Sequence, residues 1–183
     1  MSEPLRLLLD RLNTPIGEML IVTDREGILR AVDWADYETR MRGLLRRHYG
    51  ESGFTLEEGR GRHDVACAIE QYFAGDLRAL DGLRVKTAGT AFQRKVWDAL
   101  RKIPCGETVS YAGLAAQIGQ PSAVRAVGLA NGANPVGVVV PCHRVIGSNG
   151  SLTGYGGGIH RKEWLLEHES GKGSKDLREQ TLF

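Results

Sequence analysis

The sequence predicts an α+β protein in which a strand-rich N-terminal region precedes a mostly helical C-terminal region. Three short segments with strand-like patterning lie within the first 34 residues, and turns separate them. After them, apolar residues recur with helical spacing, and Ser, Thr, Pro and Gly mark where helices begin and end. We therefore predict two domains, residues 1–86 and 87–170, followed by a flexible tail, residues 171–183.

The N-terminal domain is predicted to contain three strands and two helices. The strands are expected at Leu5–Leu12, Met19–Thr23 and Ile28–Trp34, because apolar runs there are bounded by turn residues. An amphipathic helix is expected at Tyr37–Tyr49. A second helix is expected at Val65–Phe73, followed closely by a glycine suited to end it.

The C-terminal domain is predicted to begin with three helices, each preceded by a Ser or Thr that can cap it. The caps and helices are Thr90 with Phe92–Ile103, Ser110 with Tyr111–Ile118, and Ser122 with Ala123–Ala130. The last two are joined by a turn and have the pattern of a helix-turn-helix, a pattern that an ordinary helical hairpin shares. A final helix is expected to begin at Trp164–His168.

The exposed face of the third helix is expected to carry the small side chains of Ala123, Ala126 and Gly128. Small residues let a helix lie close against a narrow groove, whereas helices that read the major groove usually display long polar side chains. We therefore expect this helix to dock in the minor groove of DNA with little sequence preference.

Composition and cysteine usage exclude several classes of protein. No apolar run approaches the roughly 18 residues of a membrane helix, and the N-terminus lacks the layout of a signal peptide, so we expect no membrane contact and a cytoplasmic location. Three widely spaced cysteines, Cys67, Cys105 and Cys142, indicate reduced thiols and no disulfide framework. The histidines show no zinc-ligand spacing with them, so no metal site is expected.

Charge is distributed unevenly along the chain. Residues 1–86 carry 13 Lys or Arg against 15 Asp or Glu, whereas residues 87–183 carry 11 against 7. No acidic residue occurs from Thr108 through Lys162. An acid-free region suits contact with a phosphate backbone, although a Gly-rich apolar segment can also lack acids by chance.

The most informative stretch is VVVPCHRVIGSNGSLTGYGGG, residues 138–158, where a β-branched run ends at Pro141 and is followed directly by Cys142 and His143. We predict a strand here, since a strand end can hold a reactive side chain rigidly while the next loop shapes a pocket. Cysteine reacts as the thiolate and needs a base or a cation beside it. A bare Cys-His pair is more often an inert core cysteine beside a surface histidine, so its surroundings decide the interpretation.

Those surroundings carry a resemblance to a known family. The matching segments are GTAFQRKVWDALRKIPCGETVSYAGLA (89–115), RAVGLANGANP (125–135), PCHRVIG (141–147), LTGYGGG (152–158) and RKEWLLEHE (161–169). Together they resemble, in order and spacing over about 80 residues, the O6-alkylguanine-DNA alkyltransferases of the bacterial stand-alone type. The first 86 residues match only loosely. The resemblance implies a ribonuclease-H-like N-terminal domain and a winged-helix-like C-terminal domain.

The resemblance also implies a reaction that needs no cofactor. Cys142 would accept the alkyl group of O6-alkylguanine in double-stranded DNA and keep it as a thioether, so that each molecule reacts once. His143 would act as the base on the thiol through a water, with Glu169 orienting the imidazole. Tyr111 would donate a proton or hydrogen bond to the departing guanine. Asn134 would tie the recognition helix to the active-site strand through backbone hydrogen bonds.

The alkyl group lies within a stacked base pair, so the nucleotide must be flipped out of the duplex. Arg125 matches the arginine that would take the place of the flipped base, with phosphate binding as the alternative. The residues expected to contact DNA with it are Ser122, Ala123, Ala126 and Gly128, and those expected to line the base pocket are Val145, Tyr155, Gly156 and Gly157. Lys162 is interpreted as a surface lysine.

The pattern has departures and open ends. None of the first 47 residues is Cys or His, so a zinc site found in some relatives is not expected. We expect a monomer associated with the nucleoid, and clustering along DNA stays open. The tail sequence EQTLF loosely resembles peptides that bind sliding clamps, although short patterns of this kind are common by chance and a disordered tail is the favoured interpretation.

Two other functions are considered. One is a lesion-binding module that recruits excision repair without reacting, and the presence of Cys142 argues against it. The other is a cysteine hydrolase, which would need an oxyanion hole that nothing outside the Cys-His pair indicates.

Overall fold

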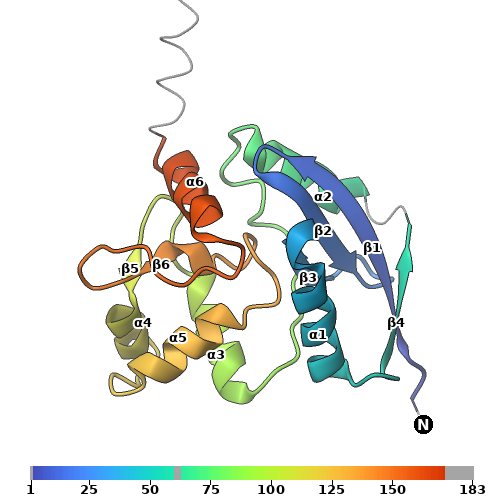
Figure 1. The fold of residues 1–183 in the computed structure, drawn as a ribbon, viewed down its shortest axis with the longest axis horizontal. Coiled ribbons are helices and arrows are strands. Elements are labelled where there is room, and N and C mark those ends of the chain that lie inside the picture. The colour runs from blue at the N-terminus through green and yellow to red at the C-terminus, as the bar shows by residue number, and fades with distance from the viewer. Residues whose placement is uncertain (1, 60–62, 172–183) are drawn as a thin grey trace, which may run out of the picture.

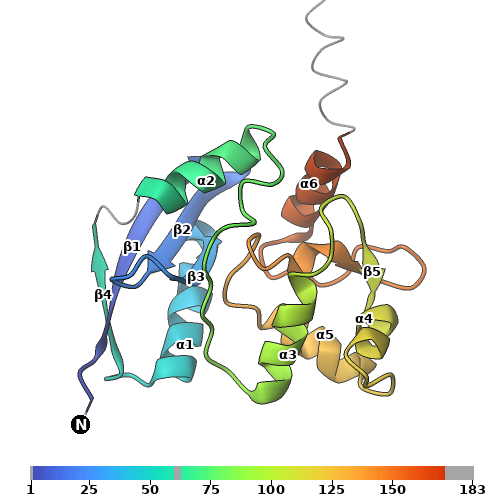
Figure 2. The ribbon, with the colours of Figure 1, turned by 180° about the vertical axis from the view of Figure 1, so that it is seen from behind.

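A four-stranded sheet with two helices lies beside a mostly helical C-terminal half in the computed structural model, which describes residues 2–59 and 63–171 (Figures 1 and 2). The predicted α+β class is therefore confirmed. Within this described part of the chain, no helix has the length and hydropathy that crossing a membrane requires. The predicted tail and its EQTLF sequence lie almost entirely outside the described residues.

The sheet has the strand order β3-β2-β1-β4. Three strands were predicted, and they pair as antiparallel neighbours: β1 (Leu5–Thr14), β2 (Gly17–Thr23) and β3 (Leu29–Trp34). The fourth, β4 (Phe54–Glu58), pairs parallel with β1 and was not predicted. It lies at the edge of the sheet with every side chain half-buried or exposed, so it carries little of the apolar pattern that marks a strand.

Both faces of β2 are covered, which explains why its sequence is an apolar run. Leu20 and Val22 belong to a small core beneath α1 (Glu38–Tyr49). Met19 and Ile21 point the other way, into a larger core that includes α2 (His63–Phe73) and much of the C-terminal half. The two halves thus share a core, and the division at residue 86 stays a prediction.

Four α-helices build the C-terminal half as far as residue 171, where its described part ends: α3 (Ala91–Leu100), α4 (Tyr111–Gln117), α5 (Val124–Gly132) and α6 (Ile159–Ser170). The caps predicted at Thr90 and Ser110 are confirmed, because each hydroxyl accepts a hydrogen bond from a backbone N–H in the first turn. The cap predicted at Ser122 is wrong. The turn before α5 is closed by the backbone bond from Ala123 N to Gln120 O, and the helix begins at Val124 without a side-chain cap.

The strand predicted to end at Pro141 is also wrong. Residues 136–140 form tight turns, in which Val139 N donates to Gly137 O and Val138 has a φ of 68°. The side chain of Asn134 makes the bonds that a neighbouring strand would make, to Val140 O at 2.8 Å and from Val136 N at 3.0 Å. These turns lead into a short 3-10 helix, η2 (Cys142–Arg144), so the reactive pair lies on a helical turn.

A two-stranded parallel ladder holds the segment after η2. The strand β6 (Val145–Ile146) continues directly from η2 and pairs with β5 (Val109–Ser110), which precedes α4. A backbone bridge between Val32 and Val136 joins β3 to the turns that precede η2. The Cys-His turn is therefore held from both halves of the chain.

Candidate active site

Cys142 begins η2 with only 7% of its surface exposed. Burial raises the pKa of its thiol, and the nearby amide of Asn134 and the cations of Lys162 and Arg40 offset only part of that effect. The thiol is therefore protonated at neutral pH and needs a base to become a nucleophile.

His143 lies next to it and is fully buried. Its Nε2 is 2.8 Å from Oε1 of Glu169, which lies 26 residues further along the chain. A carboxylate accepts only from a protonated nitrogen, so Nε2 carries the hydrogen and Nδ1 keeps its lone pair. Nδ1 has no hydrogen-bond partner among the described residues, and burial lowers the pKa of the ring. His143 is thus a neutral imidazole with one free basic nitrogen.

The carboxylate of Glu169 receives more donors than the imidazole alone. Arg144 donates through Nε to Oε2 and through Nη2 to Oε1, both at 2.9 Å, and the hydroxyl of Tyr72 donates to Oε1 at 2.7 Å. Burial would raise the pKa of this carboxyl, but the hydrogen bonds from His143 and Arg144 hold it well below its usual range. Glu169 is therefore a fixed anion that is hydrogen-bonded to Nε2 of the imidazole.

Arg144 and Tyr72 were not assigned to the site from sequence. Arg144 is part of the PCHRVIG segment and was counted only as a positive charge. Tyr72 is on α2 in the other half of the chain, where no motif pointed to it. Only the structure identifies them as site residues, because both are buried polar side chains that donate to the same carboxylate.

The interpretation of Lys162 from the sequence is wrong. This residue was interpreted as a surface lysine, but it is completely buried, and its Nζ donates to Val145 O at 2.6 Å and to Thr153 O at 3.1 Å. Burial lowers its pKa. The same Thr153 carbonyl accepts from the hydroxyl of Tyr111 at 3.0 Å. Lys162 and Tyr111 therefore both hold the loop that leads to Tyr155.

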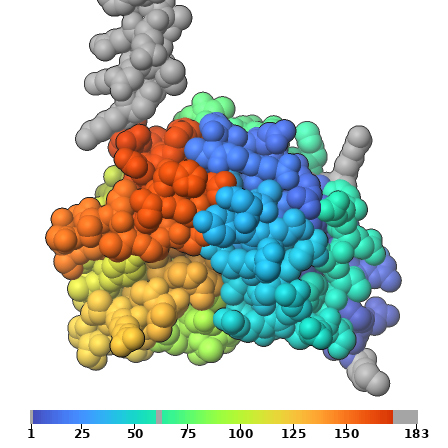
Figure 3. Space-filling model, in the orientation of Figure 1, coloured from blue at the N-terminus to red at the C-terminus, as the bar shows by residue number. Residues whose placement is uncertain are grey.

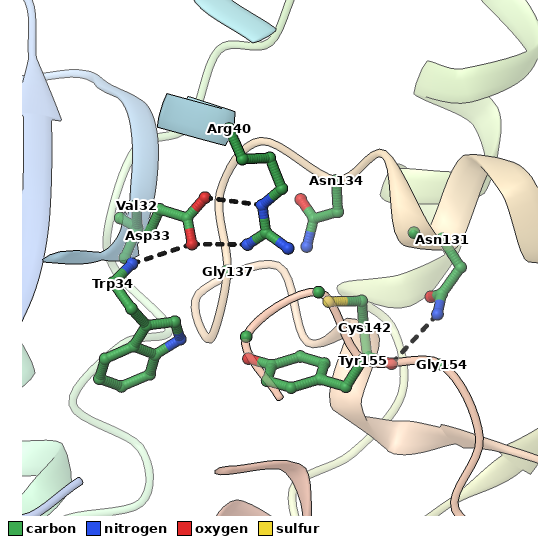
Figure 4. Close-up of a pocket in the computed structure, with 13 residues that line it drawn as sticks. Val32, Asp33, Trp34, Arg40, Asn131, Asn134, Gly137, Cys142, Gly154 and Tyr155 are labelled. Atoms are coloured by element: carbon green, nitrogen blue, oxygen red, sulfur yellow. Dashed lines mark hydrogen bonds and ion pairs between the residues drawn. The ribbon is translucent and has the colours of Figure 1, made fainter. Parts of the chain in front are cut away.

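A small cavity of about 20 Å³ adjoins Cys142. Figure 4 shows Cys142, Tyr155 and Asn134 around it, with Arg40 of α1 above, paired with Asp33 at 2.5 Å. Of the residues expected to line the base pocket, Tyr155, Gly156 and Gly157 line this cavity, whereas Val145 is fully buried on β6 and does not. The lining residues that the sequence did not indicate include Asp33, Trp34 and Arg40 from the other half. They also include Asn131, whose amide approaches Cys142 O at 3.4 Å.

Gly157 of the loop is needed for close packing against Trp34 of β3. A Cβ on Gly157 would lie 2.6 Å from Trp34 Nε1 and 2.8 Å from Tyr155 Cε1. Gly157→Ala is therefore expected to lower the free energy of unfolding by about 1–3 kcal/mol, as overpacking does in a rigid core. Gly132→Ala is the control, because no described atom outside the helix's own backbone lies within 4 Å of its added Cβ. Urea unfolding of both variants checks this, and equal stabilities would contradict it.

The predicted DNA-contacting residues lie on or just before α5. Ser122, Arg125 and Ala126 are exposed, whereas Ala123 and Gly128 are half-buried. The exposed face is not made only of small residues, because Leu129 is 71% exposed and Val124 is 37% exposed. Within the described part of the chain, no three His, Cys, Asp or Glu side chains gather closely enough to bind a metal ion.

The comparisons with known proteins all match the same kind of protein. Residues 91–171 match the family model described as 6-O-methylguanine DNA methyltransferase, DNA binding domain. A Salmonella typhimurium protein named methylated-DNA–protein-cysteine methyltransferase is 52% identical over 165 residues, covering 90% of this chain and 96% of that protein. A Methanosarcina acetivorans protein of the same name is 44% identical over 156 residues, covering 85% and 94%.

Solved structures agree with these relatives. The crystal structure of Mycobacterium tuberculosis O6-methylguanine methyltransferase superposes with a TM-score of 0.72 at 38% identity, covering 90% of this chain and 93% of that one. The structure of Mycobacterium tuberculosis OGT in complex with DNA gives a TM-score of 0.73, also at 38% identity, with coverages of 91% and 94%.

Proposed function

Because the chain belongs to the methylated-DNA–protein-cysteine methyltransferase family, we propose that it repairs O6-alkylguanine in double-stranded DNA by moving the alkyl group irreversibly to its own Cys142. The observation that carries this assignment is the chain of contacts behind the thiol. A buried cysteine is followed by a neutral histidine with a free Nδ1, whose other nitrogen donates to a buried anion. This is the order of nucleophile, base and orienting carboxylate.

The proposed reaction is a displacement at the alkyl carbon. The thiol proton of Cys142 passes through a water to Nδ1 of His143, and Sγ forms a bond to the alkyl carbon. The bond from that carbon to O6 breaks, and its electron pair goes to the guanine ring. Tyr111 donates to the ring as charge develops, for which its hydroxyl must leave Thr153 O. The thioether product has no easy route back to a thiol, so each molecule reacts once.

Access to Cys142 requires a conformational change. The cavity beside it has room for one water molecule and none for a purine. We propose that the flipped base enters as the Tyr155–Gly157 loop and Arg40 move apart, while α5 lies in the minor groove and Arg125 fills the space in the duplex. The exposure of Arg125 and Ala126 supports this placement. The glycines of the loop support tolerance of larger alkyl groups, and O4-alkylthymine is the second proposed substrate.

The finer assignments of fold and location stay proposals. The order β3-β2-β1-β4, with β4 parallel to β1, supports a ribonuclease-H-like N-terminal half. The pair α4 and α5 with the β5–β6 ladder supports a winged-helix-like C-terminal half. We propose that the protein acts as a monomer on nucleoid DNA.

Intact-protein mass spectrometry tests the function. The protein is incubated with a duplex containing O6-methylguanine, and the modified peptide is then mapped. A gain of one methyl group, about 14 Da, on the Cys142 peptide is expected, saturating at one per molecule. Tight lesion binding without a mass gain would indicate a damage-binding module instead. Repeated turnover of a small ester without a stable adduct would indicate a hydrolase.

A further inference from the structure

A second hollow, of about 750 Å³, adjoins the Cys142 cavity and lies between helices from the two halves. One wall is α1, with Arg40, Leu44 and Arg47, and the other includes α5, with Gly128 and Leu129. Figure 3 shows the α1 and α5 regions next to each other on this face. The residues that line both the hollow and the cavity are Arg40, Gly132, Gly154, Tyr155 and Gly156. The hollow is therefore continuous with the path to the thiol.

The charge of this hollow fits a nucleic-acid strand. Among the residues that the structure describes, no acidic one lines it, and α5 belongs to the acid-free region between Thr108 and Lys162. Of its two arginines, Arg40 is held by Asp33, whereas Arg47 is exposed and forms no ion pair with any described residue. An exposed arginine beside an apolar floor can bind a phosphate while the sugar and base lie against Leu44 and Leu129.

We propose that Arg47 of α1 binds a backbone phosphate of the strand that carries the damaged nucleotide. The N-terminal half would then form one wall of the DNA interface, opposite α5. This inference rests on the proposed function, because it takes the strand to run from α5 toward Cys142. It adds a phosphate contact from outside the C-terminal half.

The test compares Arg47→Ala with Arg46→Ala, a neighbouring exposed arginine of α1 that does not line the hollow. Fluorescence anisotropy with an undamaged duplex is measured at several salt concentrations. Arg47→Ala is expected to bind several-fold more weakly and to reduce the slope of log affinity against log salt by about one, while Arg46→Ala matches the wild type. Equal effects of both substitutions would overturn the proposal. A wild type that binds DNA but transfers no methyl group would instead overturn the proposed function.

An independent observation concerns Tyr72. Its side chain is completely buried, and its hydroxyl and the Nε2 of His143 donate to the same oxygen of Glu169. The carbonyl of Tyr72 also lies 2.7 Å from Nε2 of His168, one residue before that glutamate. Helix α2 thus contacts α6 at the position from which the carboxylate projects. The N-terminal half supplies one of the donors that stabilise the anion.

We infer that Tyr72 is a positioning residue that limits how strongly Glu169 attracts a proton on His143. A donor on Oε1 shares the negative charge that stabilises an imidazolium, so removing it makes the imidazole more basic. The other charged or titratable groups facing this pair come from η2, from the segment after α3 and from α6. They are Cys142, Arg144, Cys105 and Lys162.

The test is the pH dependence of single-turnover alkyl transfer by Tyr72→Phe, which keeps the ring. Neutral His143 is the reactive form, so the rate rises with pH as the ring loses its proton. In Tyr72→Phe this rise is expected at a pH higher by about half a unit or more, with the plateau rate kept. Tyr49→Phe is the control, because its hydroxyl accepts a long hydrogen bond, 3.4 Å from Arg30 Nη1, and Tyr49 does not line the Cys142 cavity.

A second measurement separates this role from a loss of packing. NMR titration of ¹⁵N-labelled histidine is expected to show a higher pKa for His143 in Tyr72→Phe than in the wild type. An unchanged pKa and pH profile would overturn the inference, as would a lower plateau rate without any shift. Failure of the wild type to transfer methyl would count against the proposed function and not against this contact.

Discussion

Cys142→Ser is expected to abolish alkyl transfer while the affinity for a duplex containing O6-methylguanine stays close to that of the wild type. The reason is that serine is a much weaker nucleophile than cysteine at this position. A hydroxyl loses its proton far less readily than a thiol, and His143 is a weakened base because burial lowers its pKa. The rate of transfer is therefore expected to fall by at least about 1,000-fold. The measurement is the mass of the protein after incubation with the damaged duplex, followed over time.

Cys67→Ser is the matched control. Cys67 is half-buried on α2, and its sulfur has only a weak contact with the Gln71 amide, so its loss is expected to leave transfer unchanged. Cys105 is a poor acceptor for another reason, since burial and the Glu169 carboxylate raise the pKa of its thiol to about 11. A methyl group recovered on Cys67 or Cys105 would refute the assignment of Cys142.

The parts of the fold that sequence predicted well are those with local signals. The first three strands are bounded by turns, and α3 and α4 begin at hydroxyl caps that the structure confirms. The errors come where a distant or unusual contact overrides the local pattern. Residues 138–140 read as a strand, yet the amide of Asn134 and a positive φ at Val138 close them into turns. A β-branched run in the sequence indicates neither the side-chain hydrogen bonds of Asn134 nor the positive φ of Val138.

The residues of the candidate site also fall into two groups, those that local sequence patterns indicate and those that depend on distant contacts. The cysteine, histidine and glutamate lie in segments with family-specific spacing, so their convergence could be anticipated. Tyr72 and Arg40 come from the half that matches the family only loosely. Their roles depend on how the sheet and the helical half pack, which periodicity does not reveal. The burial of Lys162 was not predicted because its partners are two backbone carbonyls. Every residue has a backbone carbonyl, so the residue types in the sequence do not indicate such partners.

Glu169→Gln is expected to reduce both stability and transfer. The glutamine keeps the shape but removes the charge, so Arg144 becomes a buried cation without a counter-ion and the imidazolium of His143 loses its partner. Breaking one side of a buried pair costs about 3–5 kcal/mol of unfolding free energy. Transfer is expected to slow by about 100-fold or more, since an unsupported imidazole is a weaker base. Glu167→Gln, exposed on the same helix, is the control and is expected to change neither property.

The pH dependence of stability identifies the charge as the cause. The pKa of Glu169 is lower in the folded protein than its ordinary value of 4.5, because His143 and Arg144 hydrogen-bond its anion. Its contribution to stability is therefore complete above about pH 4.5 and declines as the pH falls below that value. The wild type is expected to lose its advantage over Glu169→Gln progressively in acid. Urea unfolding at pH 7 and at successively lower pH measures this, and a gap that stays constant would mean that Glu169 stabilises the fold by shape and not by charge.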